Sequence, residues 1–309
     1  MVTEDDKMPQ YPQAEQVRRS WYIAPKPPVP KGWLVFSEDF VLRVLQGNYS
    51  ANRPARITPA WRLVALAVRG VMGVAQFVLM FLSVVPVASA IIGFLAVHFK
   101  RGALGSFIRA CYWKTKFEHL GQDTLIEHNL DVWGARGISI GSRCHVDSYI
   151  RLRAGERRYG QHGRVSIGDY VHIGPRCLVS GRGGVEVGDF VSIEAGVHVY
   201  SASNTLMNPE HPGQLISVSH AAPDGFQHAI ESPVVIGDYA VVGFGSLLMP
   251  GAAVGLGAIV HTHTQVVGQY PPFANITGPG RAKQNGWRRP PKPDPRLAEA
   301  TPADDACEQ

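Results

Sequence analysis

An aliphatic residue recurs at every sixth position through much of the second half of the chain. Fifteen positions follow this spacing within four groups, and all of them hold Ile, Leu or Val. They are Ile140, Val146, Leu152, Ile167, Ile173, Val179, Val187, Ile193, Val199, Ile236, Val242, Leu248, Val254, Val260 and Val266. A glycine follows the aliphatic residue in seven hexads. A period of six fits neither an amphipathic helix, with apolar positions about every 3.6 residues, nor an alternating strand.

A short fixed period instead indicates a solenoid, in which stacked repeats bury one apolar face against the next. Each hexad predicts a short strand with one inward aliphatic side chain, followed by a turn in which glycine adopts a positive φ angle. Three hexads make one triangular coil, so about five or six coils account for residues 125–270. The repeat therefore predicts a mainly β protein built as a parallel β-helix.

The hexads and four local motifs resemble the left-handed parallel β-helix acyltransferases, the hexapeptide-repeat family that includes sugar and galactoside O-acetyltransferases. The likeness covers roughly residues 125–283. The motifs are GVHVYSASN at 196–204, PVVIGDYAVVGFGSLLMPG at 233–251, VVGQYPPFANI at 266–276 and GPGR at 278–281. The resemblance implies a homotrimer with active sites between neighbouring β-helices, acetyl-CoA as the acyl donor and no metal. We therefore expect O-acylation of a sugar hydroxyl in a polysaccharide, a glycolipid or a lipid-linked saccharide.

Transfer of an acyl group from a thioester to a hydroxyl requires a base for the hydroxyl proton and donors for the tetrahedral oxyanion. In the galactoside and maltose acetyltransferases a histidine follows the segment that resembles GVHVYSAS, and here that position is Asn204. Residues 201–232 break the hexads and are expected to project as a loop over the neighbouring subunit. The candidate bases are histidines in or beside this loop. They are ranked His211 and His220 first, then His198 and His228.

A related branch of the family acylates amino sugars and carries a motif similar to YSAS followed by Asn-Pro. Asn204, Asn208 and Pro209 match that motif loosely. N-acylation of an amino sugar therefore remains an alternative, with Asn204 as the residue to test. A non-catalytic β-helix scaffold is another, which the long break at 201–232 disfavours.

Zinc hydrolysis is a rival reading, because the γ-type carbonic anhydrases share this fold and bind zinc through three histidines. His145, His172 and His198 are spaced by 27 and 26 residues. That family's pattern includes a close pair of histidines on one coil, and the close pair in this chain, His261 and His263, lies near the end of the repeats. The spacing therefore disfavours zinc.

For the acyl donor, the resemblance implies binding residues in the last coils. Gly243 and Phe244 correspond to positions where the pantetheine arm passes close to the backbone, and Thr262 to one that bonds this arm through its main chain. Arg281 and Lys283 are expected to hold the 3′-phosphate through charge-assisted hydrogen bonds.

Residues 70–99 contain no Lys, Arg, Asp or Glu. A membrane-spanning helix needs about 20 apolar residues, so this segment is long enough. Pro86 interrupts it, and basic residues flank both ends, whereas a simple span shows an asymmetry of positive charge. We expect a re-entrant hairpin, bent at Pro86, that holds the protein on the cytoplasmic face of the cell membrane. A helix packed inside the protein is the alternative.

The remaining organisation follows from composition. Residues 1–60 are expected to form a flexible arm with a short helix, 61–118 the membrane-associated helical segment, 119–283 the β-helix domain and 284–309 a disordered tail. The net charge of +5 is too small to indicate nucleic-acid binding. Four well-separated cysteines disfavour a disulfide scaffold. Seven arginines between Arg151 and Arg182 predict either a solvated face or a surface for anionic lipid or a diphosphate-linked sugar.

Overall fold

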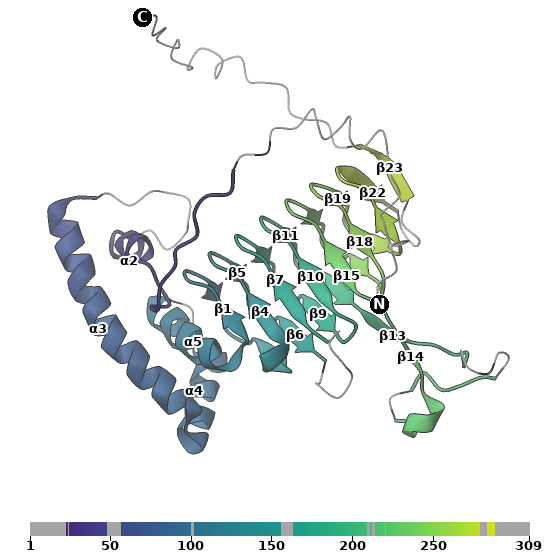
Figure 1. Cartoon of the computed structure of the whole chain (residues 1–309), viewed down its shortest axis with the longest axis horizontal. Coiled ribbons are helices and arrows are strands. Elements are labelled where there is room, and N and C mark those ends of the chain that lie inside the picture. The colour runs from purple at the N-terminus through teal and green to yellow at the C-terminus, as the bar shows by residue number, and fades with distance from the viewer. Residues whose placement is uncertain are drawn as a thin grey trace, which may run out of the picture.

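The computed structural model describes residues 23, 25–47, 57–99, 102–155, 163–208, 211, 214–219, 221–278 and 283–287. Stacked β-coils form most of the molecule, and four helices pack as a layer against the first coils (Figure 1). A loop at residues 201–232 projects from the side of the coils, and we call it the projecting loop.

Three sheets of parallel strands make the three sides of the coils. The first sheet contains β1 (His119–Leu120), β4 (Ile138–Ile140), β7 (Val165–Ile167), β10 (Val185–Val187), β15 (Val234–Ile236), β18 (Ala253–Val254) and β21 (Gln269–Tyr270). The second contains β2 (Leu125–Ile126), β5 (His145–Val146), β8 (His172–Ile173), β11 (Ser192–Ile193), β16 (Val241–Val242), β19 (Ile259–Val260), β22 (Ala274–Thr277) and the antiparallel β23 (Lys283–Trp287). The third contains β3 (Asp131–Trp133), β6 (Arg151–Ala154), β9 (Leu178–Gly181), β12 (His198–Tyr200), β17 (Leu247–Leu248) and β20 (Gln265–Val266).

The aliphatic residues of the hexads form the core of these coils. All fifteen predicted positions are buried, each at most 5% exposed. Strand pairing stacks equivalent positions of successive coils, as in Ile167 beside Val187 and Val187 beside Ile236. The predicted parallel β-helix is confirmed.

The glycines that follow the aliphatic residues do not adopt the positive φ angle that the sequence predicted for them. Gly174 and Gly237 have no positive φ angle. A Cβ atom at either position would lie 2.7 Å from a backbone nitrogen of the next coil, so they are glycines because the coils approach closely. The positive φ angle falls two residues later in the turn, as at Arg176 and Tyr239.

Aromatic side chains occupy several of these positive-φ positions and stack on one another. Tyr170, Phe190 and Tyr239 have φ angles of 58–60°, and successive ring centroids lie 4.7 Å apart. The guanidinium of Arg143, on the preceding coil, lies 6.0 Å from the Tyr170 ring. Left-handed backbone is unfavourable for such side chains, and stacking offsets part of that cost.

The helical layer contains α2 (Glu38–Leu45), α3 (Pro59–Val84), α4 (Pro86–His98) and α5 (Ala103–Lys116). The hydroxyls of Ser37 and Thr58 cap the first turns of α2 and α3, as expected for N-cap residues. α3 ends before Val85 and α4 begins at Pro86, because proline cannot continue a preceding helix.

Of the arm expected over residues 1–60, residues 23, 25–47 and 57–60 are described. Val35, Phe36, Phe40, Val41 and Leu42 are buried, whereas residues 25–28 and 31–33 are exposed. The Lys26 ammonium lies 2.5 Å from carboxylate oxygens of both Asp169 and Asp189, on successive coils. At the other end, β23 continues past the expected domain boundary at residue 283, and residues 288–309 of the expected tail lie outside the described residues.

Candidate active site

Strand register places polar side chains in columns on the outer faces of the coils. On the second sheet, His145 pairs with His172, and His172 pairs with Ser192. The two imidazole centroids are 5.5 Å apart. Both histidines and the serine therefore lie on one outer face of three successive coils.

Carboxylates from the adjoining turns accompany these histidines. His172 Nε2 lies 3.3 Å from Asp147 Oδ2, and His145 Nε2 lies 3.8 Å from Glu127 Oε1. Both imidazoles remain about two-fifths exposed. A carboxylate that orients an accessible imidazole is the arrangement of a general base, so the pair His172–Asp147 can accept a proton from a bound acceptor.

A buried arginine anchors this face to the helical layer. Arg109, in α5, is fully buried, and its Nη2 lies 3.7 Å from Glu127 Oε2. The same guanidinium donates hydrogen bonds to the carbonyl oxygens of Ile126 and Phe99. These hydrogen bonds and this ion pair hold the first coil against α5. They also hold the Glu127 carboxylate in place beside His145.

The structure separates the histidines singled out from the sequence. His198 lies on the third sheet, in register with Leu178 and Leu247, so it does not share a face with His145 and His172. His211 and His228 belong to the projecting loop, where His211 is exposed. His220 lies outside the described residues.

The base of the projecting loop is a short antiparallel pair, β13 (Ala202–Asn204) and β14 (Ala229–Glu231). Asn204 ends the first strand, and its side-chain amide donates to the carbonyl oxygen of Val218 at 3.1 Å. The loop exposes large apolar side chains, among them Leu215 and Phe226. Asn204 thus joins the start of the projecting loop to Val218 within the same loop.

The predicted donor-binding residues fall on neighbouring coils. The Gly243 and Thr262 backbones touch, because a Cβ atom on Gly243 would lie 2.8 Å from Thr262 N. Phe244 is exposed beside them, and its carbonyl oxygen accepts from His263 N. Arg281 lies outside the described residues, and of Lys283 only the backbone, in β23, is described.

The arginine-rich segment is spread over the first and third sides of the coils. Arg151 pairs with Asp131, Arg164 with Glu118 and Arg182 with Glu231, at 3.7, 3.2 and 2.6 Å. Arg153 and Arg176 are exposed. Arg157 and Arg158 lie outside the described residues.

The described cysteines do not offer a thiolate for a covalent acyl intermediate. Cys111, Cys144 and Cys177 are buried. Burial raises the pKa of the Cys144 thiol to about 12 and that of Cys177 to about 11. Because a protonated, inaccessible thiol is a poor nucleophile, none of these three cysteines is a candidate for carrying an acyl group.

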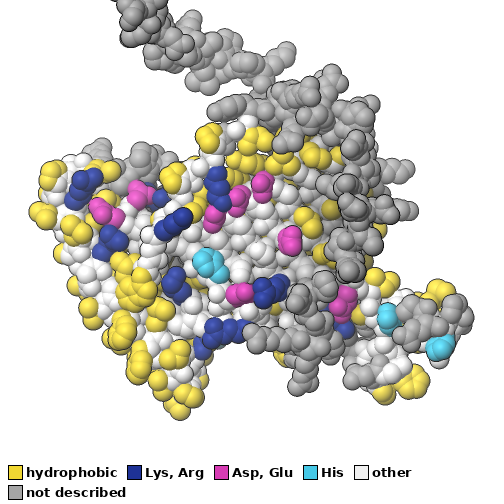
Figure 2. All heavy atoms as spheres, viewed as in Figure 1, with side chains coloured by type: hydrophobic (Ala, Val, Ile, Leu, Met, Phe, Trp, Pro, Cys, Tyr) yellow, Lys and Arg dark blue, Asp and Glu magenta, His cyan; other side chains and the backbone are white. Residues whose placement is uncertain are grey.

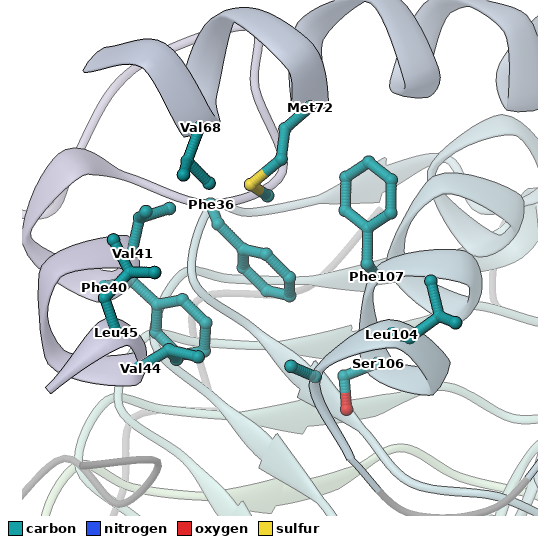
Figure 3. A pocket seen from close by; sticks show the side chains of 11 residues that line it. Phe36, Phe40, Val41, Val44, Leu45, Val68, Met72, Leu104, Ser106 and Phe107 are labelled. Atoms are coloured by element: carbon teal, nitrogen blue, oxygen red, sulfur yellow. The ribbon is translucent and has the colours of Figure 1, made fainter. Parts of the chain in front are cut away.

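A cavity of about 280 Å³ lies between α2, α3 and α5 (Figure 3). Phe36, Phe40, Met72 and Phe107 point into it, and its lining is almost wholly apolar. Ser106 supplies the one polar side chain among the labelled lining residues. Among the residues that line the cavity none is an acid or a base, whereas the outer face of the second sheet carries both.

Sequence reasoning considered His145 and His172 as zinc ligands and did not select them as a base. The signal was present as a short pattern: a polar residue, an aliphatic residue and then a carboxylate, as in His145–Val146–Asp147 and Ser192–Ile193–Glu194. Only the strand register shows that Asp147 reaches the histidine of the following coil.

Comparison with known proteins supports the class that this architecture defines. A family model described as the hexapeptide repeat of succinyl-transferase matches residues 164–201. The dTDP-4-amino-4,6-dideoxy-D-glucose acyltransferase of Escherichia coli is 28% identical over 150 residues, which are 47% of this chain and 72% of that enzyme.

Solved structures agree on the fold. A mutant of AntD, an N-acyltransferase from Bacillus cereus, in complex with dTDP and coenzyme A, matches with a TM-score of 0.50 and 22% identity, over 57% of this chain and 87% of that one. Another AntD mutant, in complex with dTDP-4-amino-4,6-dideoxyglucose and coenzyme A, matches with a TM-score of 0.50 and 19% identity, over 60% and 89%. The repeat, the coils and the likeness to the Escherichia coli enzyme support an acyltransferase of the hexapeptide-repeat type.

Proposed function

We propose that this acyltransferase moves an acyl group from a coenzyme A thioester to the amino group of a nucleotide-linked amino sugar. The observation that carries the proposal is the likeness, over 150 residues, to an enzyme that acylates dTDP-4-amino-4,6-dideoxy-D-glucose. AntD, which has similar coils, was solved with coenzyme A and that amino sugar nucleotide.

The chemistry matches the outer face of the second sheet. The neutral amine attacks the thioester carbonyl, the tetrahedral intermediate collapses with loss of the coenzyme A thiolate, and an amide forms. His172, oriented by Asp147, takes the proton released by the nitrogen and then gives it to the coenzyme A thiolate, which is released as the thiol. These steps use neither a metal nor a protein-bound acyl group.

The proposed active enzyme is a homotrimer, with each site completed by a neighbouring subunit. The apolar side chains exposed on the projecting loop, such as Leu215 and Phe226, and the exposed Phe244 support this assembly. Such side chains are typical of interfaces between subunits. In this arrangement Gly243, Phe244 and Thr262 contact the pantetheine arm, with acetyl-CoA as the first donor to test.

The acceptor's diphosphate requires cations, and Arg153 and Arg176 are exposed on or beside the third sheet. Arginine binds phosphate oxygens in a bidentate fashion, which suits a nucleotide-linked sugar. Arg281 and Lys283 remain the proposed partners of the 3′-phosphate of coenzyme A.

The proposal is tested by incubating the purified full chain with acetyl-CoA and dTDP-4-amino-4,6-dideoxyglucose. We expect a product heavier by one acetyl group, with release of one coenzyme A per product. The matched control is the sugar nucleotide with a hydroxyl in place of the amine, which should not react. Turnover of neither compound would contradict an acceptor of this class.

O-acylation of a saccharide, the expectation from the sequence, is the second candidate. The pair His172–Asp147 favours it, because a hydroxyl needs a base more than an amine does. Preferential acetylation of the hydroxyl-bearing control would select O-acylation over N-acylation.

A further inference from the structure

The outward surface of α3 and α4 is apolar along its whole length. Val71, Val74, Phe77 and Phe81 on α3 are exposed at helical spacing, and Val87 and Ile91 continue the strip on α4. Val74 and Phe77 are 68% and 64% exposed. Figure 2 shows such apolar side chains along the outer edge of the helical layer. At about 1.5 Å per residue α3 is about 39 Å long. A contiguous exposed apolar strip of this kind marks a surface that contacts a membrane or another protein.

The opposite side of α3 contacts polar backbone. Gln76, halfway along the helix, is buried, and its amide nitrogen donates to the carbonyl oxygen of Trp33 at 2.9 Å. Its Oε1 accepts from Val35 N, also at 2.9 Å. These bonds fix one side of α3 to the protein and leave the other side exposed.

The junction of α3 and α4 carries a positive charge. Lys116, the last residue of α5, donates from Nζ to the carbonyl oxygen of Ser83 at 2.8 Å and to Ser89 Oγ at 2.9 Å. β1 begins three residues after Lys116, at His119. The junction at Pro86 therefore lies beside an ammonium group and the first coil.

This position of Lys116 disfavours both insertion geometries. α3 is the one helix among those described that is long and apolar enough to cross a membrane, although length and composition alone are weak evidence for a span. A hairpin entering with Pro86 first would carry the Lys116 ammonium, and the start of β1 beyond it, into hydrocarbon. A span along α3 would place Ser83 at the far interface and draw α5, which packs against α3, through the bilayer together with Lys116. A charge in that environment costs several kcal/mol or is excluded.

We propose that the outer face of α3 and α4 lies flat on a phospholipid bilayer, with the α3 axis parallel to the membrane plane. In-plane helices bury one apolar face about 5–10 Å into the headgroup region. The half-exposed Trp33, which lies beside Gly73 on the flank of α3, is a residue type that prefers this interface. Exposed Arg62 in the first turn of α3 and the net charge of +5 favour anionic headgroups.

The first experiment measures sedimentation of the full chain with vesicles of phosphatidylcholine and phosphatidylglycerol in a 7:3 ratio. We expect the double variant Val74→Glu, Phe77→Glu to lower the bound fraction at least about tenfold, because two carboxylates would enter the interface. The matched control is Trp133→Glu, Tyr149→Glu, which places the same charges at similarly exposed side chains on the first coils, away from α3 and from the projecting loop. Equal binding of both variants, or no binding of the unaltered chain, would overturn the proposal.

The second experiment measures depth. Leu63, Val74 or Phe81 is replaced by a cysteine that carries a fluorophore, in a Cys307→Ser background in which the remaining cysteines are buried. Lipids with a nitroxide at a defined depth quench the fluorophore. These three positions share the outer side of α3. The in-plane arrangement predicts equal quenching at all three. Deepest quenching at Val74 alone would indicate a span, and quenching that deepens steadily from Leu63 to Phe81 would indicate a hairpin; either result contradicts the proposal.

A second copy of the chain is the other partner that could cover this apolar face. If the strip pairs with a second copy of the chain, Val74→Glu, Phe77→Glu should reduce the oligomeric state in vesicle-free buffer. We expect sedimentation equilibrium to show an unchanged oligomeric state. A reduced oligomeric state would contradict the bilayer proposal and indicate that this face binds a second copy of the chain.

Discussion

Ile193, in the second sheet, is fully buried, whereas Ile91, in α4, exposes 59% of its surface. The coils place Ile, Leu and Val inward at every sixth position, with polar residues on their outer faces. The helical layer presents the same residue types outward. The coils close on themselves and cover their own core, but α3 and α4 have protein on one side only. An apolar segment is therefore expected to be buried, but its sequence does not say whether it is buried in protein or in some other apolar environment. That depends on what lies beside each element.

The largest expected effect tests this contrast with one substitution in both regions. Ile193→Ala should lower the free energy of unfolding by about 2–5 kcal/mol, because the coil stack cannot collapse around the cavity. Ile91→Ala should change it by less than about 0.5 kcal/mol, as at other exposed sites. Denaturant unfolding at one fixed protein concentration, without lipid, measures both. A large loss from Ile91→Ala would mean that the outer face of α4 is covered in solution.

The next prediction compares the outer face of the coils with the projecting loop. His172→Ala should lower kcat at least about 100-fold, with little change in KM for acetyl-CoA, because it removes the base. Asp147→Asn should lower kcat less. His211→Ala serves as the matched control and should stay within a few-fold. Steady-state kinetics with saturating acceptor measures all three, and the reverse order would return the base to the projecting loop.

A smaller effect concerns the aromatic column at the coil turns. Phe190→Ala removes the middle ring between Tyr170 and Tyr239 while the backbone keeps its positive φ angle. We expect a loss of about 1–3 kcal/mol from two stacking contacts and the associated burial. Phe190→Gly should recover part of it, because glycine tolerates the left-handed conformation. Equal stability of the two variants would show that φ contributes little here.

The smallest effects are at the two helix caps. Ser37→Ala should lower the free energy of unfolding by about 1–2 kcal/mol, because Ser37 caps α2 and its hydroxyl also donates to Asp123 Oδ2 at 2.6 Å. Thr58→Ala, at the exposed start of α3, should cost about 0.5 kcal/mol. Thermal unfolding at equal protein concentration compares them. A larger loss of stability from Thr58→Ala would show that the N-cap of α3 stabilises the helical layer more than the contacts of Ser37 with α2 and Asp123 do.

Much of the candidate site was beyond the reach of sequence reasoning, and particular residues show why. The spacing of 27 residues between His145 and His172 includes an insertion, so it alone does not specify that they share a face, whereas the pairing of β5 with β8 does. The spacing of 26 between His172 and His198 looks similar but leads to the third sheet. The loop histidines were predicted as bases because the loop interrupts the repeat. An interruption of the repeat does not indicate which side chains lie close together.

The hexad by itself determined the β-helix and its core. Each six-residue unit repeats one local geometry, so its inward position can be read without any long-range contact. The proline at residue 86 likewise determined where the apolar helix breaks. Three results required the tertiary structure: that glycines serve close approach between coils, that Asp147 lies beside His172, and that Lys116 binds the junction of α3 and α4. Each depends on which distant segments lie together, and a local pattern carries no information about such pairings.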